Sequence, residues 1–235
     1  MVRSAEMNHV SKIFVSSLGV NEWRHYPEAH DVAEANGSAF AFCARFPEVF
    51  RAYVYLNPNL DWVAELAKWR DNRFFVGVKL WISNKDENGC PDICLPLLER
   101  AAGEGFVVLI HSFLRWGRPW PGELTPPEIA SLARRAPEAR ILLAHMGGQW
   151  QLGVKAVAAV PNICVDTSGG APFRGMVAGA VRQCGIERVL FGSDVPCRTI
   201  QSQLYKVLAA GLPEAEADRV LRTNAERLFS TQSED

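Results

Sequence analysis

The chain has 235 residues, 48% of them hydrophobic, which is enough for one sizeable core in a single domain spanning residues 1–235. Lys and Arg total 25 against 26 Asp and Glu, so the expected partner is a small molecule rather than nucleic acid or a membrane. The six cysteines are widely spread, and no export signal or membrane-crossing apolar run is found, which predicts a cytoplasmic protein with reduced thiols.

Short apolar segments rich in β-branched and aromatic residues recur along the chain, each followed by a loop and a stretch of helical periodicity. The predicted strands are 12–17, 52–57, 74–80, 106–111, 140–145, 162–168 and 188–194. The predicted helices are 28–46, 60–72, 91–104, 126–136, 149–159, 173–184, 199–210 and 213–229, the last packing Val220, Leu221, Leu228 and Phe229 on the barrel. This alternation is typical of parallel strands joined by crossover helices.

Two α/β architectures share this rhythm. A doubly wound open sheet would place a glycine-rich phosphate loop after the first strand, but SSLGVNEW (16–23) contains a single glycine. A TIM-barrel-like (β/α)8 fold needs no such loop, and its strands follow one another in series as these do. The pattern therefore favours the barrel, although only seven βα units can be counted where a closed barrel has eight.

Polar side chains stand at the ends of several predicted strands. Residues two apart on a strand share a face. If the apolar members face the barrel interior, the polar residues at the strand ends are predicted to face inward too and to meet at the mouth of the barrel, at the carboxyl ends of the strands. The four series are Phe75-Gly77-Lys79, Val107-Leu109-His111, Ile141-Leu143-His145 and Leu190-Gly192-Asp194.

Two readings of these tips stay open. A single histidine after a strand is commonly a structural hydrogen-bonding residue, and an aspartate there often caps the next helix. Two histidines and an aspartate clustered from three strands favour a metal, a substrate or a dense hydrogen-bond network, because an uncompensated buried charge is costly. His111, His145 and Asp194 are also a ligand set for Zn²⁺ or a similar ion, with Asp194 placed to exchange a proton with water.

The motifs GVKLW (77–81), VLIHS (108–112), ILLAHMGG (141–148), CVDTSGG (164–170), VLFGSDVP (189–196) and NAERLF (224–229) resemble the amidohydrolase superfamily. The most similar branch contains aminocarboxymuconate-semialdehyde decarboxylase-like enzymes and pyrone-dicarboxylate lactonases. The resemblance implies a (β/α)8 metal-dependent hydrolase fold with one divalent ion, zinc or else manganese. It implies metal-binding roles for His111 and Asp194, a place beside the metal for His145, and a family lysine at Lys79.

The chain departs from this family in one respect, because the His-x-His of the family's first strand does not occur. Its absence accounts for counting seven units rather than eight. A late start, a shortened relative that binds metal differently or not at all, and a non-catalytic copy each explain it. A barrel lacking strand 1 has two free strand edges, and we expect the N-terminal residues or a homodimer contact to cover them.

Aromatic and basic residues follow the predicted strands. Trp81 follows the 74–80 strand, Arg115 and Trp116 lie in the long loop 112–127, and Arg198 follows the last strand. Together with Lys79 they would suit a carboxylated, cyclic or aromatic substrate. The alternative is that the tryptophans pack loops onto the barrel and the arginines are solvated.

Three functions follow. The first is a metal-dependent hydrolase, or non-oxidative decarboxylase, acting on a small carboxylated substrate, with Asp194 as proton shuttle and His145 polarising the reacting group. The second is a metal-independent lactonase that uses Asp194 as base. The third is a non-catalytic barrel that binds a ligand.

Overall fold

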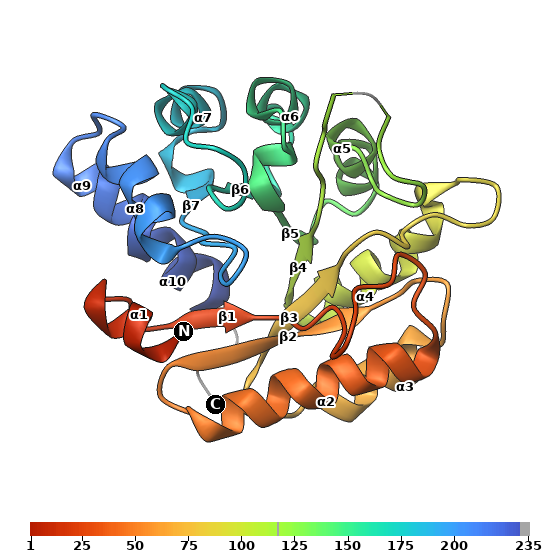
Figure 1. Cartoon of the computed structure of the whole chain (residues 1–235). Coiled ribbons are helices and arrows are strands. Elements are labelled where there is room, and N and C mark those ends of the chain that lie inside the picture. The colour runs from red at the N-terminus through yellow and green to blue at the C-terminus, as the bar shows by residue number, and fades with distance from the viewer. Residues whose placement is uncertain (117, 231–235) are drawn as a thin grey trace.

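The computed structural model describes residues 1–116 and 118–230. Within them the strands form one parallel sheet in chain order, as predicted (Figure 1). The strands are β1 (Ile13–Val15), β2 (Phe50–Leu56), β3 (Phe75–Leu80), β4 (Val107–Ile110), β5 (Arg140–Leu143), β6 (Ile163–Asp166) and β7 (Val189–Leu190). No pairing joins β1 to β7 in this part of the chain, so the sheet is a curled half-barrel with seven βα units.

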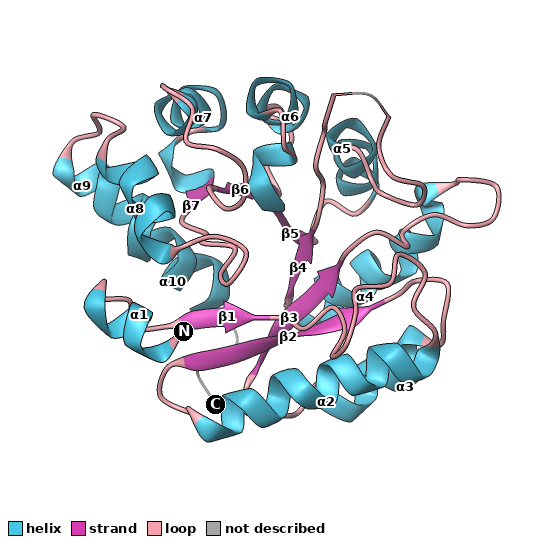
Figure 2. Ribbon diagram, viewed as in Figure 1, coloured by secondary structure: helices cyan, strands magenta, loops and turns pink. Residues whose placement is uncertain are grey.

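Helices flank the sheet, most of them on its outer face (Figure 2). They are α1 (Val2–Met7), α2 (Ala29–Arg45), α3 (Trp62–Trp69), α4 (Leu95–Glu104), α5 (Pro126–Arg135), α6 (Trp150–Val157), α7 (Met176–Cys184), α8 (Ile200–Leu208), α9 (Glu214–Asp218) and α10 (Asn224–Phe229). In the described residues no helix combines the length and apolar character that a membrane crossing requires.

The helix boundaries follow local chemistry. At the start of α5, Thr125 and Glu128 form a reciprocal capping box and Pro126 occupies the first turn, where a missing N–H costs nothing. At the end of α4, Gly105 adopts the left-handed conformation that closes many helices. These signals explain why the predicted and observed ends of both helices nearly coincide.

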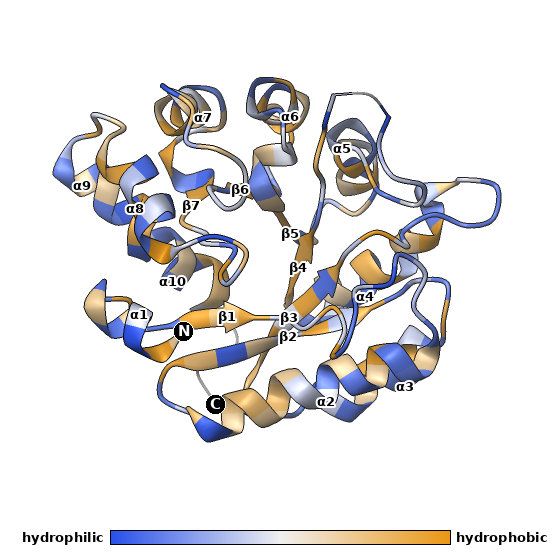
Figure 3. Cartoon of the chain, in the orientation of Figure 1, coloured by the Kyte–Doolittle hydropathy of each residue, from blue (hydrophilic) through white to orange (hydrophobic). Residues whose placement is uncertain are grey.

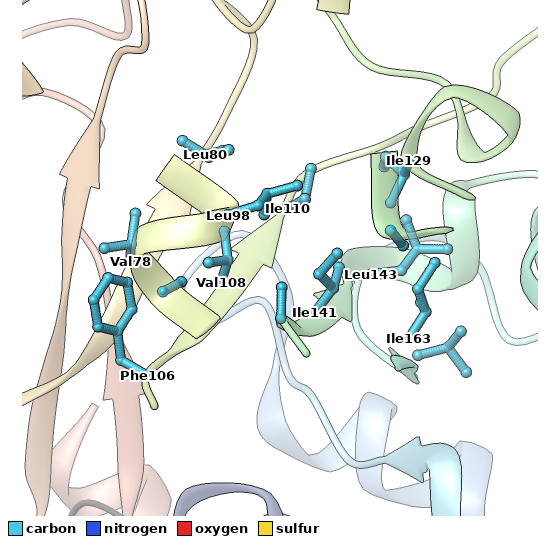
Figure 4. Packing of buried hydrophobic residues seen from close by; sticks show 14 of the residues in the cluster. Val78, Leu80, Leu98, Phe106, Val108, Ile110, Ile129, Ile141, Leu143 and Ile163 are labelled. Atoms are coloured by element: carbon cyan, nitrogen blue, oxygen red, sulfur yellow. The ribbon is translucent and has the colours of Figure 1, made fainter. Parts of the chain in front are cut away.

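Two packed groups on opposite sides of the strands hold most of the buried apolar residues, and a third group surrounds Tyr55 and Trp81. The larger lies between sheet and helices: Val108 and Ile110 of β4 and Ile141 and Leu143 of β5 face this side, close to Leu98 and Ile129 of the helices (Figure 4). The smaller fills the interior of the half-barrel, with Tyr53, Val107, Leu142, Cys164 and Leu190. The strands are accordingly apolar along most of their length (Figure 3), as expected when both faces are covered.

The end of the C-terminal segment packs into the interior of the half-barrel. Leu228 and Phe229 of α10 belong to the interior group, and the Phe229 ring lies 4.6 Å from that of Phe14 in β1. The predicted packing of the last helix on the barrel is therefore confirmed, and its end also enters the interior.

The same segment covers the free edge of β7. The N–H of Phe191 donates to the carbonyl of Val220 at 2.7 Å, in the π-helical turn η4 (Arg219–Thr223). The buried Asn224 side chain donates to the carbonyl of Val189 at 2.9 Å. The expectation that N-terminal residues would cover the edges is thus wrong for this edge, because the chain's own C-terminal segment does so.

Candidate active site

The predicted polar residues lie at the carboxyl ends of the strands, but they reach the mouth by different routes. His111 directly follows β4, and its N–H donates to the Leu80 carbonyl, continuing the β3–β4 ladder. The alternation predicted for β4 is confirmed, because Val107 and Leu109 face the interior. The last strand is shorter than the predicted 188–194, so Asp194 lies in the following loop rather than on the strand.

The predicted alternation is wrong for β3. Phe75 packs toward the helices, while Val76 faces the interior. The pairing with β2 shifts here, since Ala52 pairs with Phe75 but Tyr53 pairs with Gly77. Gly77 allows this bulge: its φ is +152°, and a Cβ would lie 2.3 Å from the Val107 carbonyl oxygen.

The alternation is also wrong for β5, where Leu142 rather than Ile141 or Leu143 faces the interior. His145 reaches the mouth because it lies in the turn η2 (Ala144–Gly147) with a left-handed φ of 61°. Asp194 has a similar φ of 57°. Non-glycine residues adopt this conformation rarely and often at functional sites, and it cannot be read from strand periodicity.

The two histidines form a contiguous pair. Nε2 of His145 lies 3.2 Å from Nδ1 of His111, and Nδ1 of His145 lies 2.8 Å from Oγ of Ser168. Burial of the rings lowers both pKa values, that of His145 to about 4, so both imidazoles are neutral near pH 7. A Cβ on Gly169 would lie 2.4 Å from Nδ1 of His145, so this glycine makes room for the ring.

Glu123 is a site residue that the sequence analysis missed. It lies in the loop after β4, is 1% exposed, and its Oε1 is 3.1 Å from Nε2 of His111. The carboxylate pairs with Arg115 and accepts backbone N–H groups from Phe113 and Trp120. Although burial opposes ionisation, the contacts with His111, Arg115 and the Trp120 N–H lower its pKa to about 2. An isolated Glu in an irregular loop carries no periodic signal, so only the fold reveals it.

Two buried lysines face the same mouth. Lys79 is 6% exposed, and burial lowers its pKa to about 8 against the attraction of Asp166 and Asp194. Within the described residues its ammonium makes neither a hydrogen bond nor an ion pair. Lys206 of α8, equally buried and with its pKa likewise lowered to about 8, instead donates to the carbonyls of Thr167 and Gly169.

The remaining predicted substrate contacts are dispersed. Trp81 is buried, with its ring 6.1 Å from that of Trp23, whereas Trp116 is 93% exposed. Both terminal nitrogens of Arg115 donate to Glu123, and the exposed Arg198 side chain donates to the neighbouring Cys197 carbonyl. The structure thus brings Lys79, His111 and His145 together, leaves Asp194 half-exposed beside them, and places Trp116 and Arg198 at the surface.

The implied divalent metal can be tested against this arrangement. His145 directs one ring nitrogen at Ser168 and the other at His111, which leaves it no nitrogen for an ion. In the residues that the structure describes, no three His, Cys, Asp or Glu side chains gather as metal ligands do. The arrangement therefore does not fit a metal held by His111, His145 and Asp194 together, and that ligand set stays a prediction.

Comparison with known protein families shows which family this chain belongs to. The family model described as amidohydrolase matches residues 18–231. The chain belongs to the amidohydrolase family. Amidohydrolases are enzymes, and both the fold and the motifs identified from the sequence agree with this membership. Among curated proteins, none matches the sequence.

Solved structures share the fold at low identity. 2,6-Dihydroxybenzoate decarboxylase from Rhizobium matches with a TM-score of 0.76 and 19% identity, covering 99% of this chain and 88% of its own. 5-Carboxyvanillate decarboxylase from Sphingomonas paucimobilis matches with a TM-score of 0.69 and 17% identity, covering 97% and 82%. A zinc-bound amidohydrolase from Burkholderia multivorans matches with a TM-score of 0.72 and 12% identity, covering 97% and 86%.

Proposed function

We propose that this amidohydrolase acts on a small carboxylated ring compound bound at the mouth of the half-barrel. The observation that carries the proposal is Lys79, whose side chain is largely buried while its ammonium forms no ion pair among the described residues. Burial disfavours the charged form of the amine, and a ligand carboxylate within ion-pair distance would stabilise it. Decarboxylases of carboxylated aromatics among the structural neighbours support the same substrate class.

The reaction that we propose first is hydrolysis of an amide or lactone. Asp194, half-exposed at the mouth, is placed to take a proton from water as the water oxygen attacks the carbonyl carbon. The same carboxyl group then returns the proton to the leaving nitrogen or oxygen as its bond to carbon breaks. Lys79 holds the substrate carboxylate, and the neutral histidines orient the reacting carbonyl.

Non-oxidative decarboxylation is the second candidate, favoured by the decarboxylases with this fold. Here a protonated Asp194 gives its proton to the ring carbon, the bond between that carbon and the carboxylate breaks, and CO₂ leaves. Lys79 would then hold another anionic group of the substrate, because binding the departing carboxylate tightly would oppose its loss of charge.

A panel assay tests the proposal. Carboxylated lactones, amides and hydroxybenzoates are offered to the protein, and ring opening, amide cleavage and CO₂ release are measured. We expect turnover of at least one compound, and loss of at least about 100-fold in kcat for Asp194→Asn, since removing a proton-transfer group costs about that much. Asp71→Asn, at an exposed carboxylate, is the matched control. Unchanged kcat in Asp194→Asn would refute its role.

The metal requirement is measured separately. Neighbours with this fold were crystallised with manganese or zinc, which supports a divalent ion as cofactor. About one equivalent of zinc or manganese with activity lost on chelation supports metal-assisted hydrolysis, with a ligand beyond the histidine pair. Full activity after chelation supports Asp194 acting directly on water.

A further inference from the structure

Lys206 is a buried lysine near the mouth that the proposed reaction does not use. It lies on the buried face of α8 together with Gln203, whereas Tyr205 on the opposite face is 66% exposed. A lysine on a helix ordinarily keeps its ammonium in water, so an ammonium buried here requires polar partners. Those partners are the backbone carbonyls of Thr167, at 3.1 Å, and of Gly169.

The two carbonyls belong to the turn 167–170, which follows β6. Gly169 and Gly170 both adopt left-handed φ values, of 64° and 53°, and Thr167 is fully buried. A buried carbonyl needs a hydrogen-bond donor, and one ammonium carries enough N–H groups to serve both carbonyls. Lys206 therefore holds the turn against α8 by two hydrogen bonds.

The same turn contacts the candidate active site. A Cβ on Gly169 would lie 2.4 Å from Nδ1 of His145, so the backbone of the turn packs directly against that ring. The N–H of Gly192, just before Asp194, donates to Oγ1 of Thr167 at 3.1 Å. The turn thus supports both the ring of His145 and the segment that leads to Asp194.

The helix that carries Lys206 is also joined to Asp194 through the chain. The loop after β7 carries Asp194, whose carbonyl accepts the Arg198 N–H at 3.0 Å, and it runs directly into α8, which Thr199 caps. Because α8 both continues this loop and holds the turn beside His145, a shift of the turn on the helix changes the spacing of His145 and Asp194.

We propose that Lys206 is a positioning residue, which holds the turn 167–170 on α8 and so fixes the His145 ring relative to Asp194. The inference rests on the proposed function, in which these two side chains act on one substrate. Lys206 acts through the turn and does not contact substrate, in contrast to Lys79.

NMR of the histidine rings and backbone amides tests the positioning without any substrate. Lys206→Met keeps a long apolar side chain but removes both hydrogen bonds, so the signals of the His145 ring and the Gly192 N–H should shift or broaden. The ring signals of the exposed His30 should stay in place and serve as an internal control. Lys206→Arg keeps a long donor and should retain the original signals, and Lys155→Met, at an exposed lysine of α6, is the matched control.

Kinetics on a turned-over panel compound gives the second readout, with each variant first shown by circular dichroism to be folded at the assay temperature. Lys206→Met should lower kcat about 10- to 100-fold with KM changed less than about 2-fold, because a misplaced reacting group slows the chemical step. Lys206→Arg should recover most of the loss. If Lys206→Met does not fold, Lys206→Gln, whose neutral amide ends one bond nearer the helix, should show the same changes at smaller size.

Two results would overturn the proposal. The first is a His145 ring and a Gly192 N–H whose signals are the same in Lys206→Met, or in Lys206→Gln, as in the unaltered protein. The second is a raised KM with unchanged kcat, which would make Lys206 a substrate contact instead. Absence of turnover together with the expected NMR changes would count against the proposed function alone.

Discussion

At the scale of single residues, the site is an array of buried charges and neutral imidazoles around a buried ammonium. The residue types at the ends of the 74–80, 106–111 and 140–145 strands could be predicted, because apolar runs that end in Lys or His stand out in the sequence. The left-handed turns at His145 and Asp194 could not, since they depend on contacts with other loops. Glu123 could not either, because only the fold places it beside His111.

The lowered pKa of Lys79 predicts a pH dependence of substrate binding. Its ammonium is charged below a pKa of about 8, and a carboxylated substrate needs that charge. KM should therefore be constant below pH 8 and rise about 10-fold per pH unit above it. KM profiles for a carboxylated substrate and its uncharged amide analogue check this, and a flat carboxylate profile up to pH 10 would contradict it.

The lowered pKa of Lys79 also affects stability: as pH rises above 8, substrate binding weakens but the free energy of unfolding increases. In the unfolded chain Lys79 titrates near 10.5, so between pH 8 and 10.5 the unfolded state binds more protons than the folded state. The contribution of Lys79 to the free energy of unfolding therefore rises with pH through this window.

At the scale of elements, the C-terminal helical segment is hydrogen-bonded to the edge strand β7. The helix 213–229 and its apolar residues could be predicted from periodicity, as Val220, Leu228 and Phe229 show. That Asn224 joins this segment to the edge of β7 could not be predicted, because an asparagine in a helix is ordinarily a solvated residue. The bulge at Gly77 was missed for a similar reason, since it is defined by pairing with β2.

Asn224→Ala tests the role of this link. The Asn224 amide is buried and donates to the carbonyls of Ile186 and Val189 at 2.7 and 2.9 Å. Its removal takes the side-chain donor from both carbonyls, of which that of Ile186 still accepts the Val189 N–H, so we expect a loss of about 1–3 kcal/mol in the free energy of unfolding. Denaturant unfolding measures it, with exposed Asn88→Ala as control. A loss no larger than the control's would show that the link contributes little.

At the scale of the molecule, seven βα units in series could be predicted from the spacing of the apolar segments, and the half-barrel confirms them. Which segment covers the unpaired edges of the sheet could not be predicted, because it depends on which distant part of the chain folds back onto them. The free edge of β7 is occupied by η4 and Asn224, and β1 is only three residues long. Short or covered edges are poor templates for pairing between chains.

This arrangement predicts a monomer in solution rather than the homodimer considered from the sequence. The expected mass is 26.0 kDa for the full chain. Light scattering after gel filtration, over a tenfold range of protein concentration, measures it. A species of twice that mass at all concentrations would contradict the prediction and indicate pairing through the β1 edge.

The central claim is that the mouth binds a small carboxylated ring through Lys79, and calorimetric titration with 2,6-dihydroxybenzoate measures it most directly. We expect saturable binding near pH 7 and a Kd raised about 10- to 100-fold in Lys79→Met, as expected for loss of a charge-assisted bond. Arg198→Met, which removes an exposed cation, should change Kd less than about 2-fold. Equal affinity in the unaltered protein and in Lys79→Met would contradict the account.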